Sequence, residues 1–295
     1  MAEPGFVLDG RAVRRSFDRA AAGYDAAAGL QAEVRRELLS RLDYTTLEPR
    51  VVVDLGCGTG HASRALKDRY PKARVIAIDL AEGMLREAGR RRGWLRRFAR
   101  VCADARRLPL ATGSVDLVFS SLMMQWCPEL DALFGEFRRV LAPRGLVNFT
   151  TFGPDTLREL RAAWAEADGG VHVNAFTDMH DLGAGLVRAG LAEPVLDVER
   201  YTLTYPDTLA LMRDLKAIGA RNLNAARARG LTGRRRLAAM QAAYERQRRD
   251  GLLPATWEGV FGQAWGPAAQ APVRGRRGGE FTFDLAALGR RGPGS

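Results

Sequence analysis

The segment Asp54-Leu55-Gly56-Cys57-Gly58-Thr59-Gly60 holds the residues whose types and spacing best suit binding chemistry. Glycine lets the backbone turn tightly and approach a ligand with no Cβ in the way. A helix that begins after such a loop presents unpaired N–H groups to a negative or polar ligand. The segment therefore predicts a ligand-binding loop, with contacts from Gly56, Cys57, Gly58 and Gly60.

The spacing of these glycines and the acid before them restrict the kind of ligand. A dinucleotide fingerprint, G-x-G-x-x-G, would need its third glycine at position 61, which is His61 here. Asp54 would repel a pyrophosphate, whereas its carboxylate would stabilise an ammonium group directly or through a water. The pattern thus favours a nucleoside that carries an amino-acid end.

Two further acids follow the next two predicted strands. Asp79, 23 residues after Gly56, would accept hydrogen bonds from both hydroxyls of a ribose, and Asp104 would accept from an adenine amino group. An acid after a strand is also typical of a helix cap. The glycine loop and both acids, in this order at strand ends, together favour S-adenosylmethionine as the cofactor. Leu80 and Met84 are expected on the two faces of the adenine and Ser120 near the methionine moiety. Ala105, next to Asp104, is a further expected contact.

Strands that alternate with helices are needed to position these side chains. Apolar residues at helical spacing predict one or two helices over residues 11–42, before the first strand. Alternation of strands and helices over about 100 residues predicts an α/β fold, with a parallel sheet built from right-handed crossovers. The five predicted strands are residues 50–55, 73–79, 99–103, 115–120 and 146–152.

The second half of the chain predicts a lid and a final pair of strands. Helices are predicted at 155–167 and 178–189, and strands at 194–205 and 255–265. Between these strands, residues 206–250 hold two amphipathic helices, which predict a helical lid over a substrate site. We expect one domain over residues 1–266. A flexible tail over 267–295 is expected because that segment is rich in Gly, Pro, Ala and Arg.

The formal net charge of +11 comes almost entirely from arginine. The clusters Arg234 to Arg236 and Arg248–Arg249 are most simply solvated helix faces. A positive field would also attract an acidic partner, either nucleic acid or an acidic carrier protein, and charge alone does not choose between them.

Several other classes of protein are disfavoured by composition. The three cysteines are few, odd in number and widely spaced, which predicts buried thiols in a reducing cytoplasm. The three histidines form no ligand pair, so we expect no metal. The sequence contains no run of 18 consecutive apolar residues, so a membrane span is not expected. The first ten residues lack the basic start and apolar run of a secretory signal.

Four segments, in order, resemble class I S-adenosylmethionine-dependent methyltransferases: VVVDLGCGTG, VIAIDLAEGML, CADARRLPLATGSVDLVFSSL and RVLAPRGLVNFTTF. The resemblance implies a seven-stranded, mostly parallel Rossmann-like sheet with helices on both faces and the last strand antiparallel. The predicted strands at 194–205 and 255–265 would supply the final pair.

Longer segments are similar to the malonyl-acyl-carrier-protein O-methyltransferases of early biotin (pimeloyl) synthesis, with few gaps from Arg14 to Trp265. They are SFDRAAAGYDAAAGLQAEV, SLMMQWCPELDALFGEFRRVLAPRG and MRDLKAIGARN, the last with the family's LK-x-IGA pattern at residues 215–220. The resemblance implies that a malonyl carboxylate attacks the sulfonium methyl in line and becomes a methyl ester. A carboxylate is ionised at neutral pH, so this reaction requires no general base. The implied partner is an acidic acyl carrier protein that bears a malonyl thioester, for which arginine side chains would form a weak docking surface.

Candidate catalytic and substrate residues follow from their positions in the chain. Tyr24 lies in a predicted helix that could cover the cofactor, although it could equally pack that helix onto the sheet. Gln125 and Trp126 follow the fourth strand, at the rim beside the methyl group; Trp126 could also be a plain core residue. Candidates in the lid for contacts to the carboxylate or to the phosphopantetheine phosphate are Arg213, Lys216 and Arg221.

Three alternative functions remain open on the sequence. The first is methylation of another small molecule, such as a quinone precursor. The second is a non-methylating hydroxylase or assembly factor, because some mitochondrial respiratory-complex assembly proteins share much of this pattern. The third, RNA binding, is disfavoured because clustered aromatics of the stacking type are lacking. We expect a monomer without nucleic-acid or membrane partners.

Overall fold

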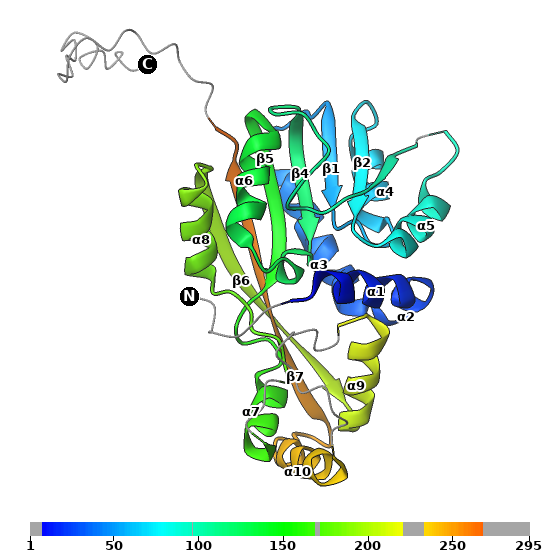
Figure 1. Ribbon diagram of the computed structural model, residues 1–295, viewed down its shortest axis with the longest axis vertical. Coiled ribbons are helices and arrows are strands. Elements are labelled where there is room, and N and C mark those ends of the chain that lie inside the picture. Colours follow the sequence, from blue (N-terminus) through cyan, green and yellow to red (C-terminus); the bar gives the residue numbers. More distant parts are fainter. Residues whose placement is uncertain (1–7, 96, 169–171, 221–232, 268–295) are drawn as a thin grey trace, which may run out of the picture.

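The computed structural model describes residues 8–95, 97–168, 172–220 and 233–267 (Figure 1). Within these ranges seven strands form one sheet, in the order β3-β2-β1-β4-β5-β7-β6. The first five strands pair in parallel, and β7 runs antiparallel to both of its neighbours. The predicted seven-stranded, mostly parallel Rossmann-like sheet is confirmed. The strands are β1 (Val51–Leu55), β2 (Arg74–Asp79), β3 (Ala99–Cys102), β4 (Val115–Ser121), β5 (Leu141–Phe152), β6 (Ala192–Tyr205) and β7 (Leu253–Trp265).

Helices cover both faces of this sheet, because successive residues of each buried strand point to opposite sides. Val52 packs in a core with residues of α3 and α4, whereas Val53 packs in a second core with residues of α6 and α8. The helices are α1 (Gly10–Ala20), α2 (Tyr24–Ala27), α3 (Gly29–Ser40), α4 (His61–Arg69), α5 (Glu82–Arg91), α6 (Leu130–Val140), α7 (Arg158–Ala167), α8 (Met179–Arg188), α9 (Thr208–Ala217) and α10 (Arg234–Glu245), with short 3-10 turns at η1 (Ala21–Gly23), η2 (Arg41–Tyr44) and η3 (Met124–Trp126).

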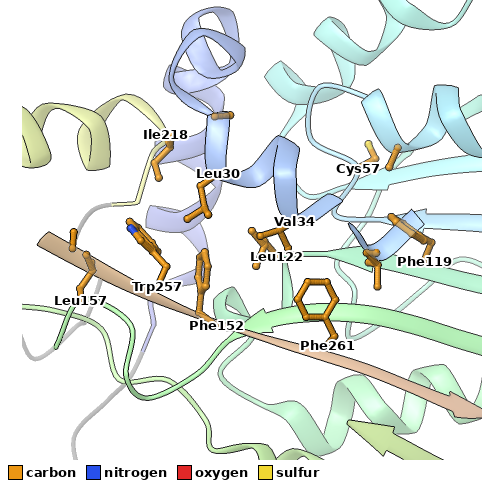
Figure 2. Packing of buried hydrophobic residues seen from close by; sticks show 14 of the residues in the cluster. Leu30, Val34, Cys57, Phe119, Leu122, Phe152, Leu157, Ile218, Trp257 and Phe261 are labelled. Carbon is orange, nitrogen blue, oxygen red and sulfur yellow. The ribbon is translucent and has the colours of Figure 1, made fainter. Parts of the chain in front are cut away.

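The core on the α3 side continues from the sheet into the lid. Figure 2 shows Leu30 and Val34 of α3 on the same side as Phe261 of β7. Ile218, which follows α9, and Trp257 of β7 belong to the same cluster of buried residues. The segment predicted as a lid is therefore packed onto the sheet by continuous apolar contact.

The segment predicted as a lid, with α9 and α10, packs together with one helix from outside it, α7. The long β6–β7 ribbon extends beyond the other strands, and α7, α9 and α10 lie around its far end (Figure 1). The predicted lid spans residues 206–250, but α7 also packs against α10. Gln247 Nε2 donates to the Glu159 carbonyl at 3.1 Å, and Arg246 pairs with Glu166. The apolar side of α7 is buried there. Helical periodicity in the sequence shows that α7 has an apolar face, but it does not show which element that face packs against.

Two boundaries differ from the prediction. The helical stretch 11–42 is divided into α1, η1, α2 and α3, with Gly23 and Gly29 at the breaks. β5 begins at Leu141, before the Pro143-Arg144-Gly145 turn, and its pairing with β4 shifts register there. Residues 268–295, most of the predicted tail, lie outside the described residues. Across the described ranges, no helix has both the length and the apolarity to cross a membrane.

Candidate active site

A pocket opens at the carboxyl ends of β1, β2 and β4, where open α/β sheets bind their ligands. α1 and α2 lie below these strand ends in Figure 1 and form its cover. The pocket brings together residues from five segments that are far apart in the chain. Nine of the predicted site residues line it: Tyr24, Gly56, Gly58, Asp79, Leu80, Met84, Asp104, Ala105 and Trp126.

The glycine loop takes a backbone path that favours glycine at all three positions. Gly56, Gly58 and Gly60 have φ values of +71°, +52° and +85°. A Cβ on Gly60 would lie 2.9 Å from the Ala88 backbone, so this glycine lets the loop pack against α5. A Cβ on Gly58 would meet no atom within 4 Å, because Gly58 faces the pocket. Gly58 and Gly60 therefore have different roles: Gly60 allows close packing against α5, and Gly58 leaves room for a ligand.

Alanine substitutions are expected to separate these two roles. Gly60→Ala combines left-handed strain with a backbone clash and is expected to lower the free energy of unfolding by about 3 kcal/mol. Gly58→Ala carries the strain alone, about 1 kcal/mol, but its methyl group enters the pocket and is expected to weaken binding of the predicted cofactor by roughly tenfold. Thermal unfolding of the ligand-free protein and calorimetry with S-adenosylhomocysteine measure both effects. Equal losses of stability in the two variants would contradict this division.

Asp79 uses one carboxylate oxygen to hold the glycine loop and the other to hold the turn before α5. Oδ2 accepts a hydrogen bond from the Gly58 backbone N–H at 2.9 Å, and Oδ1 accepts from that of Ala81 at 2.8 Å. Burial raises the pKa of Asp79 to about 6, while these hydrogen bonds act in the opposite direction. The carboxylate lines the pocket at the end of β2, where its remaining lone pairs would accept from ribose hydroxyls.

Asp54 lies beneath the pocket rather than in its lining. Its side chain is buried and accepts a hydrogen bond from Ser63 Oγ of α4. Burial raises the pKa of Asp54 to about 7; the Ser63 hydrogen bond lowers it, the nearby Asp79 raises it and Arg35 lowers it. At neutral pH this acid is therefore poised between its two protonation states, and a cation bound above the loop would favour the charged form.

Asp104 is engaged by an arginine that the sequence analysis did not single out. Arg106 Nε and Nη2 donate to Asp104 Oδ1 and Oδ2 at 3.1 and 2.7 Å, and Arg106 also pairs with Glu129 at 2.9 Å. The hydrogen bonds from Arg106 lower the pKa of Asp104, so it is a carboxylate at neutral pH. Arg106 also lines the pocket. The sequence feature that could have identified Arg106 is its position two residues after Asp104, in a turn, where it can reach the Asp104 carboxylate.

Aromatic and apolar side chains close the pocket from the N-terminal side. Phe17 of α1 meets Trp126 edge to face, with ring centroids 5.2 Å apart. Val13 and Tyr24 complete this cover. Burial raises the pKa of Tyr24 to about 12, with Asp79 adding to the effect, so the phenol keeps its proton and remains a hydrogen-bond donor. The apolar cover would exclude water from a bound ligand.

Four predicted residues lie behind the pocket wall. Ser120 is buried and donates to the Leu55 carbonyl at 3.0 Å, so the wall of β4 at this point is formed by Ser121 instead. Strand alternation explains the exchange. Cys57 and Gly60 support the loop from below, with the Cys57 side chain in the α3 core. Gln125 is held by the Leu122 carbonyl and by Thr151 and is absent from the pocket lining.

The lid candidates divide into two that are described and one that is not. Arg213 and Lys216 of α9 line a second pocket, on the other side of α1, together with Arg19. Arg221 lies outside the described residues. Among those residues, no group of three or more His, Cys, Asp or Glu side chains is arranged to hold a metal ion.

Comparisons with solved structures support the fold. A Bacillus halodurans protein assigned as a methyltransferase matches with a TM-score of 0.57 at 19% identity, over 79% of this chain and 100% of that chain. A Haemonchus contortus phosphoethanolamine N-methyltransferase matches with a TM-score of 0.54 at 17% identity, over 88% of this chain and 61% of that chain.

Comparisons of sequence are more specific. A family model described as a methyltransferase domain matches residues 53–149. A malonyl-acyl-carrier-protein O-methyltransferase from Methylovorus sp. is 54% identical over 92% of this chain and 94% of that protein. One from Laribacter hongkongensis is 55% identical over 90% and 92%. The chain belongs to the malonyl-acyl-carrier-protein O-methyltransferase family, within the class I S-adenosylmethionine-dependent methyltransferases.

Proposed function

We propose that this protein transfers a methyl group from S-adenosylmethionine to the free carboxylate of malonyl-acyl-carrier protein, at the start of biotin (pimeloyl) synthesis. The observation that carries the proposal is the pocket at the strand ends, with Gly58, Asp79 and Asp104 on its wall, in a chain 54% identical to a protein of that name. The alternatives, another small acceptor or a non-methylating relative, have no comparable support.

The pocket residues fit the parts of this cofactor. Asp79 would accept from the ribose, Leu80 and Met84 would cover the adenine, and Asp104 would accept from its amino group. Asp54 would compensate the ammonium group from beneath the loop. When bound, S-adenosylmethionine supplies a methyl group activated by a cationic sulfur. The residues of this chain would position the acceptor, among them Tyr24 and Trp126 of the aromatic cover, which line the pocket.

The acceptor carboxylate needs no base from the protein, because it is already ionised at neutral pH. The site instead orients the two reactants and excludes water. Together these effects lower the activation free energy of methyl transfer by roughly several kcal/mol. Tyr24, as a neutral phenol, would donate to one carboxylate oxygen and leave the other free.

Transfer is tested with methyl-labelled S-adenosylmethionine and malonyl-carrier protein, followed by mass analysis of the carrier. We expect one added methyl and an equal amount of S-adenosylhomocysteine. Acetyl-carrier protein, which lacks the free carboxylate, is the control and should remain unmodified. Methylation of a phenolic panel with none on the malonyl substrate would point to another acceptor, and no S-adenosylhomocysteine would point to a non-methylating relative.

Carrier docking is expected to involve the exposed arginines that begin α10. Arg234 and Arg235 are exposed, whereas Arg236 lies 3.7 Å from Asp168 and Arg248 is bound to Glu245. The double variant Arg234→Glu/Arg235→Glu should raise the KM of the carrier substrate by about tenfold at low salt. Steady-state kinetics with the carrier and with a small malonyl thioester measure it; an equal effect on both substrates would contradict a docking role.

The organisation of the protein completes the proposal. We infer one domain over residues 1–266 that acts as a monomer in the cytoplasm, with no nucleic-acid or membrane partner. Free thiols at Cys57, Cys102 and Cys127 fit a reducing compartment. Light scattering of the purified protein tests the monomer.

A further inference from the structure

The second pocket lies between the first helices and the lid, and its charge is unbalanced. Its lining includes Ser16, Arg19 and Gly23 on one side and Arg213 and Lys216 of α9 on the other. In the part of the chain that the structure describes, this lining holds three cations and no acid. Among the described residues, none of the three cations forms an ion pair, unlike neighbouring Arg14, which pairs with Glu82 at 3.0 Å.

The acids next to these cations in the chain are engaged elsewhere. Asp18 Oδ1 accepts from the Gly83 backbone N–H at 2.7 Å. The Asp214 side chain is hydrogen-bonded with Tyr205. Arg213 and Lys216, three residues apart on one helix, are neighbours on its surface, where like charges repel. The arrangement costs stability, and an anion bound between the cations would offset that cost.

The pocket is held in shape by the lid's LK-x-IGA segment. Ser16 Oγ, buried in α1, donates to the Gly219 carbonyl at 3.0 Å. Gly219 has a φ of +74° and packs close to Phe17 and Ala20, and Ile218 is buried beneath it. These contacts fix the end of α9 on α1, so Lys216 is placed opposite Arg19 by the fold.

α1 and the turns that follow it, η1 and α2, separate this pocket from the active-site pocket. Val13, Phe17 and Tyr24 line the active site, whereas Ser16, Arg19 and Gly23 line the second pocket. A helix with its side chains is about 10–12 Å thick. A substrate with one end in the active site and a second anionic group one helix thickness away would fill both.

We propose that Arg19, Arg213 and Lys216 bind the phosphate of a phosphopantetheine arm. This inference rests on the proposed function, in which the carboxylate of the malonyl group occupies the active site. The other anion of the arm is its phosphodiester, and clustered Arg and Lys side chains suit phosphate oxygens. Carrier protein and coenzyme A both bear a phosphate at this place on the arm, as a phosphodiester in the carrier and as the first phosphate of a diphosphate in coenzyme A, so the site would bind the arm of either.

Calorimetry of the full chain with 4′-phosphopantetheine and with pantetheine tests the site, since the two ligands differ only in the phosphate. We expect the phosphorylated ligand to bind at least tenfold more tightly. Arg19→Gln, Arg213→Gln and Lys216→Gln should each reduce this ratio several-fold, and the triple variant should bring it to about one. Arg74→Gln and Lys72→Gln, exposed at the opposite end of the sheet, are the matched controls and should keep the ratio.

Three results would overturn the inference: equal affinity for both ligands in the unaltered protein, a ratio that survives in the triple variant, or losses confined to carrier protein with coenzyme A thioesters unaffected. The last would mean that the cations meet the carrier's own surface. The binding ratio is measured without turnover. Absence of methyl transfer would therefore remove the proposed function and leave the phosphate site to be judged on the calorimetry.

Discussion

Asp79→Asn is expected to weaken S-adenosylmethionine binding by about 100-fold, the larger of the two strongest effects that the structure predicts. An amide has one acceptor oxygen and cannot serve the N–H groups of both Gly58 and Ala81, which Asp79 now accepts from at 2.9 and 2.8 Å. One N–H would face the amide NH2, the glycine loop would shift and the ribose would lose its acceptor. Each such charge-assisted bond contributes about 1.5–3 kcal/mol. Calorimetry with S-adenosylhomocysteine measures the loss.

Asp116→Asn provides a matched control at the other end of the sheet. Asp116 Oδ2 accepts from the backbone N–H groups of Arg50 and Val51, both at 2.8 Å. Because both bonds end on one oxygen, an amide oxygen can still accept them, so this variant should keep most of its stability while cofactor affinity stays within about twofold. If both variants lost affinity equally, the effect of Asp79→Asn would come from general loosening of the sheet.

Asp54→Asn is expected to stabilise the ligand-free protein and to weaken cofactor binding. The amide oxygen still accepts from Ser63, but the buried charge is gone. Because burial raises the pKa of Asp54 from 3.8 to about 7, the folded state binds more protons than the unfolded state between those values. Its stability therefore falls as pH rises from about 4 to 7, and the loss is complete above the folded pKa. Removing the charge should recover a few kcal/mol at pH 8, since one pKa unit corresponds to about 1.4 kcal/mol.

Thermal unfolding at pH 5 and pH 8 tests the stability half of this prediction. The variant should melt several degrees higher at pH 8 and much closer to the unaltered protein at pH 5. Cofactor affinity should fall by roughly 10- to 100-fold, because the ammonium group loses its counter-charge. In the unaltered protein, affinity should weaken as pH drops from 7 to 5, where Asp79 and Asp54 become protonated. If Asp54→Asn were less stable than the unaltered protein at pH 8, the predicted stabilisation by removal of the buried charge would be wrong.

The positions of β1, β2 and β4 could be predicted because these strands are buried on both faces and therefore read as apolar, β-branched runs. β1, β2, β3 and β4 begin or end within one residue of their predicted bounds. The breaks around α2 and the docking of α7 on α10 could not be predicted, since both depend on contacts with residues more than 50 positions away. Periodicity shows that a helix has an apolar face and not what that face meets.

The candidate residues that the sequence places at strand ends lie together in the structure, whereas the direction of some other side chains differs from the expectation. Gly58, Asp79 and Asp104 line the pocket because the parallel sheet brings their strand ends to one edge. The sequence analysis named Ser120, but its neighbour Ser121 lines the pocket. Successive side chains of a strand point to opposite faces, so an error of one residue puts the side chain on the wrong face. The second-pocket partner Arg19 was missed because it meets α9 only through the fold, 194 residues along the chain from Arg213.

α1 forms a wall of both pockets, with Phe17 on one side and Arg19 on the other. A displacement of this helix on filling one pocket changes the free energy of filling the other. Thermodynamic reciprocity then requires the two ligands to alter each other's affinity by the same factor. If an acceptor arm in the second pocket stabilises the position of α1 that covers the first, the methyl donor would be held more tightly once the acceptor has arrived.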